Sequence, residues 1–229
     1  MKMNALTNLL CVAVLGLAAS ASGQSAFTVN FNFAGMPGDQ ASTAGVSDSA
    51  FVSGAIVDRG PGIFPAAAGN SISSNGWDSP DPAQDYFSIR FEVDPGYFVT
   101  LDNLLIGSRS SNTGPGVLAL RFNGDGFASD LAVLNQDGGF KNDNIDLSVL
   151  PDLTGTVEFR IVATADVRAN GDPEISPNGT FRLTNYFDGG DTGGMTFGGT
   201  VSVIPEPSTY AFLVGILGLA VVVFRRRRA

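Results

Sequence analysis

The sequence predicts an all-β protein whose main domain is an antiparallel β-sandwich of the jelly-roll kind, placed between a signal peptide and a single C-terminal transmembrane helix. Two observations predict the sandwich: apolar and polar residues alternate in many short segments, and no segment of the body keeps an apolar period of 3.6 residues. A third, an apolar run at each end of the chain, predicts the two terminal segments. Alternation buries one face of each strand, so two one-sided sheets packed together are expected. A closed barrel is the alternative.

The expected strands follow one another at short spacing through the body of the chain. In the first, aromatic and aliphatic residues alternate with Thr28, Asn30 and Asn32. Clusters of glycine, asparagine, aspartate and proline at 112–116 and 188–191 predict the loops between strands. The strands are expected at 27–33, 87–93, 97–106, 117–122, 157–163, 181–187 and 196–203.

Composition excludes several kinds of chemistry. Histidine is absent from all 229 residues, which excludes the Ser-His-Asp and Cys-His hydrolases and histidine metal sites. When Lys2, Glu206 and the four arginines near the C-terminus are set aside, 21 acidic and 8 basic residues remain, a formal charge of −13. A body this acidic is repelled by phosphate backbones, so no nucleic acid partner is expected.

The N-terminus is typical of an export signal. Lys2 gives a positive n-region, residues 9–19 an apolar h-region, and Ala19 and Ala21 a small-x-small cleavage site. One alternative places the cleavage site at Ala21-Ser22-Gly23. The other is that this segment forms a buried first helix. We expect the Sec machinery to export the chain and residues 1–21 to be removed. The single cysteine, Cys11, leaves with them, so the mature chain has no thiol for a disulfide, a nucleophile or a metal.

The C-terminus combines three features in order. Two prolines flank an acidic residue in Pro205-Glu206-Pro207, which favours an extended, accessible backbone. An uncharged run at 210–224 follows; as a helix it would rise about 22 Å, and flanking residues would complete the roughly 30 Å hydrocarbon core. The run ends at a membrane-stop cluster of Arg225, Arg226, Arg227 and Arg228. Arginines after a span stay cytoplasmic, which leaves the acidic body outside.

This three-part tail resembles the PEP-CTERM sorting signal. Such tails are recognised by exosortase, a membrane-embedded transpeptidase-like protease of Gram-negative bacteria that make exopolysaccharide. The resemblance implies an inner-membrane intermediate that is cleaved near Pro205-Glu206-Pro207 and passed to the cell surface or extracellular matrix. An ordinary single-pass anchor is the alternative. The expected organisation is a signal peptide at 1–21, a β-sandwich ectodomain at 22–203 and the sorting signal at 204–229.

The body is also similar to the β-rich extracellular regions that commonly precede these tails. That likeness implies an exported β domain and no particular reaction. The segments that carry it are 76–77, 85–87, 108–115, 125–129, 157–160 and 179–183.

Three candidate sites lie in the body. Asn123 and Asp125 place oxygen side chains two apart among glycines, a pattern that suits calcium, and 142–146 is a second such cluster. Turns stabilised by their own Asn and Asp side chains are the alternative for both. Trp77, the only tryptophan, is a candidate platform for stacking on a sugar ring, with the plugging of a sandwich edge as its alternative. No motif supports a catalytic pair among the carboxylates, so no catalytic residue is expected.

The sequence therefore predicts a non-enzymatic, exosortase-sorted protein of the cell surface or matrix. The alternative is a carbohydrate-binding module that holds exopolysaccharide, with or without calcium. A polysaccharide-processing enzyme is the third and least supported hypothesis.

Overall fold

The computed structural model describes residues 23–188, 191–205, 215–216, 219 and 223–226. The chain divides into two compact units: Ser25–Val201, and Met1–Gln24 together with Ser202–Ala229. The predicted signal peptide and most of the predicted span at 210–224 lie outside the described residues. Within the described part of the chain, no helix has the length and apolar character needed to cross a membrane.

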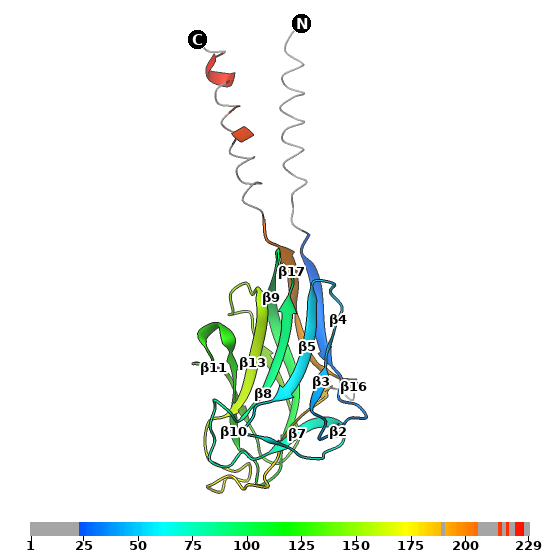
Figure 1. Ribbon diagram of the computed structural model, residues 1–229, viewed down its shortest axis with the longest axis vertical. Coiled ribbons are helices and arrows are strands. Elements are labelled where there is room, and N and C mark those ends of the chain that lie inside the picture. The colour runs from blue at the N-terminus through cyan, green and yellow to red at the C-terminus, as the bar shows by residue number, and fades with distance from the viewer. Residues whose placement is uncertain (1–22, 189–190, 206–214, 217–218, 220–222, 227–229) are drawn as a thin grey trace. The chain divides into compact units, whose positions relative to one another are not determined.

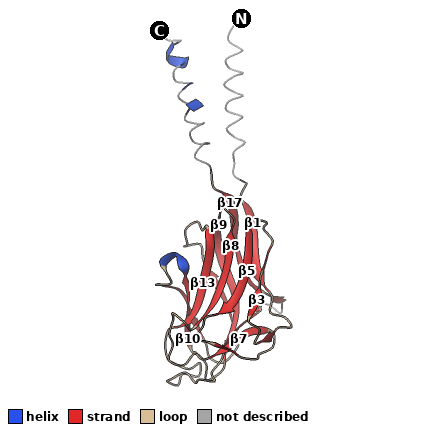
Figure 2. Ribbon diagram, in the orientation of Figure 1, coloured by secondary structure: helices blue, strands red, loops and turns tan. Residues whose placement is uncertain are grey.

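The unit Ser25–Val201 is built almost entirely of strands (Figures 1 and 2). Its helical content among the described residues is one 3-10 turn, η2 (Asn123–Asp125). The longer strands are β1 (Ser25–Phe31), β5 (Val52–Arg59), β7 (Ser71–Asn75), β8 (Tyr86–Val93), β9 (Tyr97–Ser110), β10 (Val117–Phe122), β11 (Asp130–Asn135), β12 (Lys141–Asp146), β13 (Gly155–Ala163), β14 (Phe181–Thr184) and β17 (Met195–Val203). The short strands are β2 (Pro37–Gly38), β3 (Ser42–Ala44), β4 (Val46–Ser47), β6 (Phe64–Pro65), β15 (Tyr186–Asp188) and β16 (Asp191–Gly193).

Two large sheets make up the sandwich, and β15 and β16 form a separate two-stranded sheet. The larger has the strand order β2-β7-β14-β9-β17-β1-β4, with β12 also paired to β9 and β6 to β7. The smaller has the order β11-β10-β13-β8-β5-β3. Both are antiparallel apart from the two-residue parallel pairing of β2 with β7. Figure 1 shows β5, β8 and β13 as one layer in front of β9 and β17.

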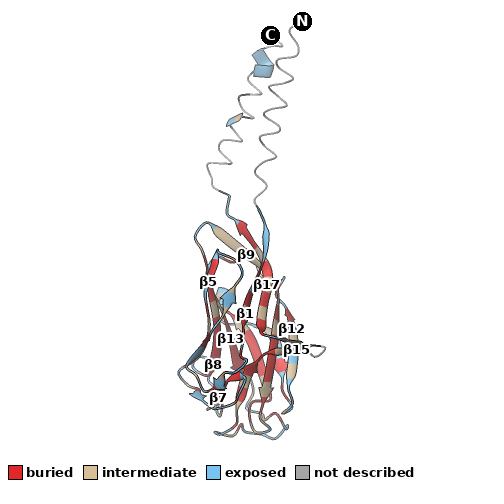
Figure 3. Ribbon diagram, turned by 90° about the vertical axis from the view of Figure 1, so that its right-hand side faces the viewer, coloured by how far each residue is buried: buried red, intermediate tan, exposed pale blue. Residues whose placement is uncertain are grey.

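The two layers bury one aromatic-rich core between them (Figure 3). Phe197 of the larger sheet packs on Phe91 and Phe159 of the smaller, with ring centroids 5.5 Å and 5.2 Å apart. Such ring pairs add to the stabilisation that burial of apolar area already provides. The predicted jelly-roll-like antiparallel sandwich is thus confirmed. The closed-barrel alternative is wrong, because the strands form two distinct sheets.

Most strands with clear alternation were correctly predicted, whereas four longer strands, β5, β7, β11 and β12, were not. The segment 117–122 coincides with β10, while 181–187 is divided at Asn185 into β14 and β15. The prediction omitted β7 because its sequence, SISSN, offers one large apolar residue and places its serines in the interior. It also omitted β12, whose sequence KNDNID points mostly polar groups outward. Both strands are held by their neighbours in the sheet rather than by their own pattern.

Candidate functional site

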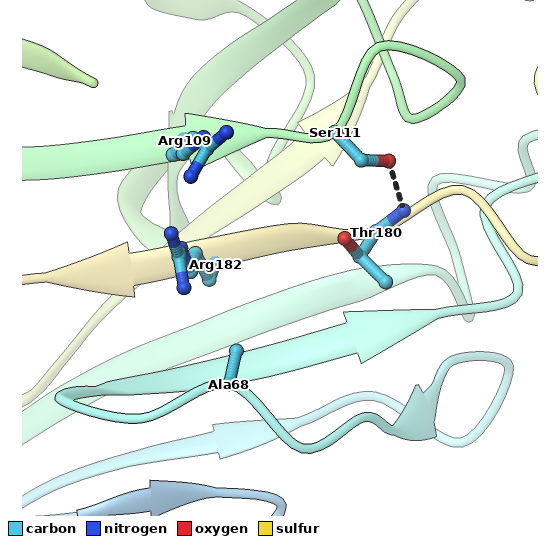
Figure 4. A pocket seen from close by; sticks show the side chains of 5 residues that line it. All are labelled: Ala68, Arg109, Ser111, Thr180 and Arg182. Atoms are coloured by element: carbon cyan, nitrogen blue, oxygen red, sulfur yellow. Dashed lines mark hydrogen bonds between the residues drawn. The ribbon is translucent and has the colours of Figure 1, made fainter. Parts of the chain in front are cut away.

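A pocket of about 200 Å³ opens beside the C-terminal end of β9. Its lining comes from β9, from β14, and from the loops just before β7, just after β9 and just before β14 (Figure 4). The hydroxyl of Ser111 accepts a hydrogen bond from the backbone N–H of Thr180 at 2.9 Å, which ties the loop after β9 to the start of β14. The lining residues are Ala68, Arg109, Ser111, Thr180 and Arg182.

Two arginines lie side by side in this pocket because of the sheet register. Strands β9 and β14 are antiparallel neighbours, and Arg109 stands directly opposite Arg182. Figure 4 shows the two side chains one above the other on the adjacent strands. Directly opposed like charges on a sheet are destabilising by themselves. The arrangement therefore needs compensation from other groups.

Part of that compensation comes from an aromatic ring. The guanidinium carbon of Arg109 lies 5.0 Å from the ring centroid of Phe140, and that of Arg182 lies 4.9 Å from it. Cations over an aromatic face are attracted to its negative quadrupole. Phe140 nevertheless remains 57% exposed. Phe187 meets its ring edge-on at 6.5 Å, so two partly exposed rings stand beside the arginine pair.

The turn that carries Phe140 is set by glycine. Gly138 has φ +88°, a left-handed conformation that favours glycine, and a Cβ there would come within 2.2 Å of the side-chain oxygen of Asn112. The Nε–H of Arg109 donates to the carbonyl of Gly138 at 2.9 Å. These contacts hold the turn between β11 and β12 against β9 and position Phe140 over both cations.

The pairing of the other cations sets this pair apart. Five of the eight basic residues of the body are in ion pairs, namely Arg90–Asp58, Arg121–Asp130, Lys141–Asp137, Arg160–Glu158 and Arg168–Asp172. A sixth, Arg59, donates to the backbone carbonyls of Gly38, Gln40 and Ser73. The remaining two are Arg109 and Arg182, and neither forms an ion pair with a described residue. Burial, and secondarily the positive charge of Arg109, lower the pKa of Arg182 below its usual value.

The expectation of a sugar-stacking platform at Trp77 is wrong for the folded domain. Trp77 is 0% exposed, and its indole N–H donates to the carbonyl of Ser74 at 3.0 Å. Phe87 of the smaller sheet and Phe181 of the larger lie 5.9 Å and 5.8 Å from it. The indole is thus fully enclosed in the core, as the alternative of an edge plug requires.

The side-chain oxygens of Asn123 and Asp125 accept hydrogen bonds from backbone N–H groups, those of Asp125 from its own loop and that of Asn123 from β13. The two carboxylate oxygens of Asp125 accept hydrogen bonds from the backbone N–H groups of Ala128 and Ser129, both at 3.0 Å. The side-chain oxygen of Asn123 accepts from the N–H of Glu158 at 3.2 Å. These contacts favour the loop-stabilising alternative, and calcium binding there stays a prediction.

The residues of the predicted terminal signals fall mostly outside the described part of the chain. Pro205 follows β17, and Arg225 and Arg226 belong to the helical residues 223–226. The other members lie outside the described residues: Ala19, Ala21, Glu206, Pro207, Arg227 and Arg228.

The sequence did not point to Arg109, Arg182 or Phe140 as a site. Arg109 and Arg182 are 73 positions apart, and only the pairing of β14 with β9 brings them together. The sequence gives only an indirect signal for the two arginines. With a charge of −13, the body has more than enough acidic residues to pair its eight basic ones, so a basic residue without an acidic partner is unexpected.

Comparison with known proteins gives one match to a family model and a set of fold likenesses. A mutant of a family 29 carbohydrate binding module is 12% identical, with a TM-score of 0.38, over 77% of this chain and 92% of that chain. A second mutant, complexed with cellulohexaose, is 13% identical, with a TM-score of 0.40, over 76% of this chain and 91% of that chain. At these identities and TM-scores, the likenesses do not define a ligand. No curated protein matches the sequence.

The family match lies at the end of the chain. It begins with the last residue of β17 and takes in the proline pair, the apolar run and the arginines. Residues 203–228 match the model described as the PEP-CTERM protein-sorting motif, and the chain is therefore a β-sandwich protein that carries a PEP-CTERM sorting signal.

Proposed function

We propose that this protein is an exported, exosortase-processed component of the cell surface or extracellular matrix of a Gram-negative bacterium that makes exopolysaccharide, and that its sandwich is non-enzymatic. The observation that carries the proposal is the PEP-CTERM motif at 203–228, which starts where the last strand ends.

The proposed route uses each part of the chain once. Residues 1–21 direct export through the Sec machinery, and 22–203 fold outside as the ectodomain. The apolar run 210–224 halts in the inner membrane, with the arginine cluster in the cytoplasm. Exosortase then cleaves near Pro205-Glu206-Pro207 and passes the ectodomain on to the surface or matrix.

The pairing of the first and last strands supports release of the ectodomain. Strand β1 pairs with β17 from Ser25↔Val201 to Phe31↔Met195, an unbroken antiparallel ladder. Every residue of this ladder lies within the unit Ser25–Val201. Cleavage after Val203 would therefore leave its backbone hydrogen bonds intact.

The chain contains its own control for the sorting test. The double variant Pro205→Ala/Pro207→Ala should leave a full-length, membrane-retained protein, measured by immunoblot of membrane and extracellular fractions. Pro80→Ala/Pro82→Ala changes a second Pro-acid-Pro sequence, Pro80-Asp81-Pro82, and should mature normally. Normal maturation of the first variant would refute the role of the motif.

A carbohydrate-binding ectodomain is the second candidate function. The pocket with its arginine pair, and the exposed ring of Phe140 beside it, favour this candidate. The test is binding of the protein to polysaccharides of the source organism, with added calcium and with a chelator. Failure to bind any glycan under either condition would remove the candidate, and release of sugars would replace it with the enzymatic hypothesis.

A further inference from the structure

We propose that the pocket lined by Arg109 and Arg182, with Phe140 beside the two guanidinium groups, binds the carboxylate of an acidic sugar unit, a uronic acid residue of a polysaccharide. The proposal rests on the carbohydrate-binding function above and names its substrate class.

The local charge at this place favours an anion, although the body as a whole is acidic. The body carries 21 acidic residues and only 8 basic ones, yet Arg109 and Arg182 stand opposite each other without an ionic partner among the described residues. All six other basic residues have ionic or backbone partners. Two facing cations with unused donors are a ready-made receptor for an oxyanion.

The donor geometry suits a carboxylate. A guanidinium is a planar fork of N–H donors that matches a carboxylate in two-pronged fashion, and it stays charged at all ordinary pH values. The Nε–H of Arg109 donates to the carbonyl of Gly138, so the terminal nitrogens of Arg109 remain available to a ligand. Arg182 donates no hydrogen bond to any described residue, and its contact is with the ring of Phe140.

The surrounding groups suit a sugar ring better than a bare ion. Phe140 is 57% exposed and Phe187 39% exposed, and the two rings meet edge-on beside the arginines. Exposed aromatic rings offer apolar faces to the C–H face of a sugar, with a polar group nearby to fix orientation. The Ser111 and Thr180 residues of the lining add hydroxyl groups for the sugar's own hydroxyls.

The test compares an acidic and a neutral oligosaccharide on the full-length protein in detergent, by isothermal titration calorimetry at constant ionic strength. The probes are an oligogalacturonate, a cello-oligosaccharide of the same length, and sodium sulfate. The acidic oligosaccharide should bind at least about tenfold more tightly than either of the others. Equal binding of the neutral oligosaccharide, or of sulfate, would overturn the assignment.

Two matched variants locate the site. Arg182→Gln should weaken oligogalacturonate binding by about tenfold or more, because one of the two guanidinium forks is lost. Arg90→Gln makes the same charge change on β8, in the other sheet, and should leave binding unchanged. Equal affinities of these two variants would overturn the proposal.

Folding and function can be read separately. Removal of Arg182 breaks no hydrogen bond to a described residue, so the buried Trp77 should keep its native fluorescence. Phe140→Ala, at an exposed position, is a second variant that should also weaken binding several-fold. If neutral glycans bind and Arg182→Gln has no effect, the carbohydrate-binding function stands and this site falls. If no glycan binds at all, both fall.

Discussion

Arg59 is the residue whose loss should most clearly weaken the sandwich at the edge where its sheets meet. It ends β5 of the smaller sheet, yet its guanidinium donates to the carbonyl of Ser73 at 2.7 Å and to the hydroxyl of Ser74 at 2.8 Å, both in β7 of the larger sheet. It also donates to the carbonyls of Gly38 at 2.7 Å and Gln40 at 2.5 Å. One side chain of the smaller sheet thus donates to four acceptors, three of them in strands β2 and β7 of the larger sheet.

The magnitude follows from those acceptors. In Arg59→Met the methylenes are largely retained and every donor is lost. The carbonyl of Ser73 still accepts from the backbone N–H of Ala66, and each of the other acceptors, left unpaired, costs about 1 kcal/mol or more. Burial lowers the pKa of Arg59, with Asp39 opposing the shift, so its removal also relieves some desolvation. We expect a net loss of about 3 kcal/mol, or a fall of about 6–12 °C in Tm for a domain of this size.

The assay is urea denaturation followed by the fluorescence of Trp77, the only tryptophan and a fully buried one. The control is Arg90→Met, which removes an ion pair to Asp58 at 2.8 Å from a side chain that is 39% exposed. Exposed pairs of this kind contribute about 0–1 kcal/mol. If the free energies of unfolding of the two variants agree within about 1 kcal/mol, the role assigned to Arg59 is refuted.

The remaining predictions concern three buried positions. Trp77→Phe should cost about 2 kcal/mol through lost volume and the unpaired carbonyl of Ser74, measured by circular dichroism; an unchanged unfolding midpoint would contradict the packing described. Gly107→Ala places a Cβ 2.1 Å from the carbonyl oxygen of Asn185 and should cost about 2 kcal/mol or more, whereas Gly69→Ala meets nothing within 4 Å and should be neutral. Asp85 is 7% exposed, and its burial raises its pKa, so folding favours the protonated form and stability falls as pH rises through that pKa. Asp85→Asn should therefore be the more stable form at pH 7, with no difference below about pH 3; a stabilisation that persists there would refute this cause.

Regular alternation made most of the sandwich predictable. The observed bounds of β10 agree with the prediction, because its run of apolar residues can be buried only inside the sandwich. Strand β7 was not predicted, because its serines give no apolar pattern. Its buried serines are held in place by the pairing of β7 with β14 and by hydrogen bonds from Arg59. The local sequence of β10 is therefore enough to predict a strand, whereas β7 depends on contacts with residues distant in sequence.

The candidate site was the least predictable part. The sequence favours Trp77 as a sugar platform because tryptophan rings stack well on sugars. In the folded domain Trp77 lies in the core instead, where the burial of its large apolar area stabilises the fold. The residues of the candidate site are ordinary in sequence: two of the eight arginines and lysines of the body line the pocket, and one of the chain's seventeen phenylalanines lies beside them. The two arginines form a candidate site because neither has an ionic partner among the described residues.

The sequence by itself determined the class of fold, the PEP-CTERM motif at residues 203–228 and the absence of histidine chemistry, because these depend on composition and on patterns within a few residues. Only the tertiary structure decided which side chains meet. The register of β9 with β14 places Arg109 opposite Arg182, and the left-handed turn at Gly138 brings Phe140 over both. Such contacts join residues tens of positions apart, and they follow from the packing of whole sheets rather than from any local preference.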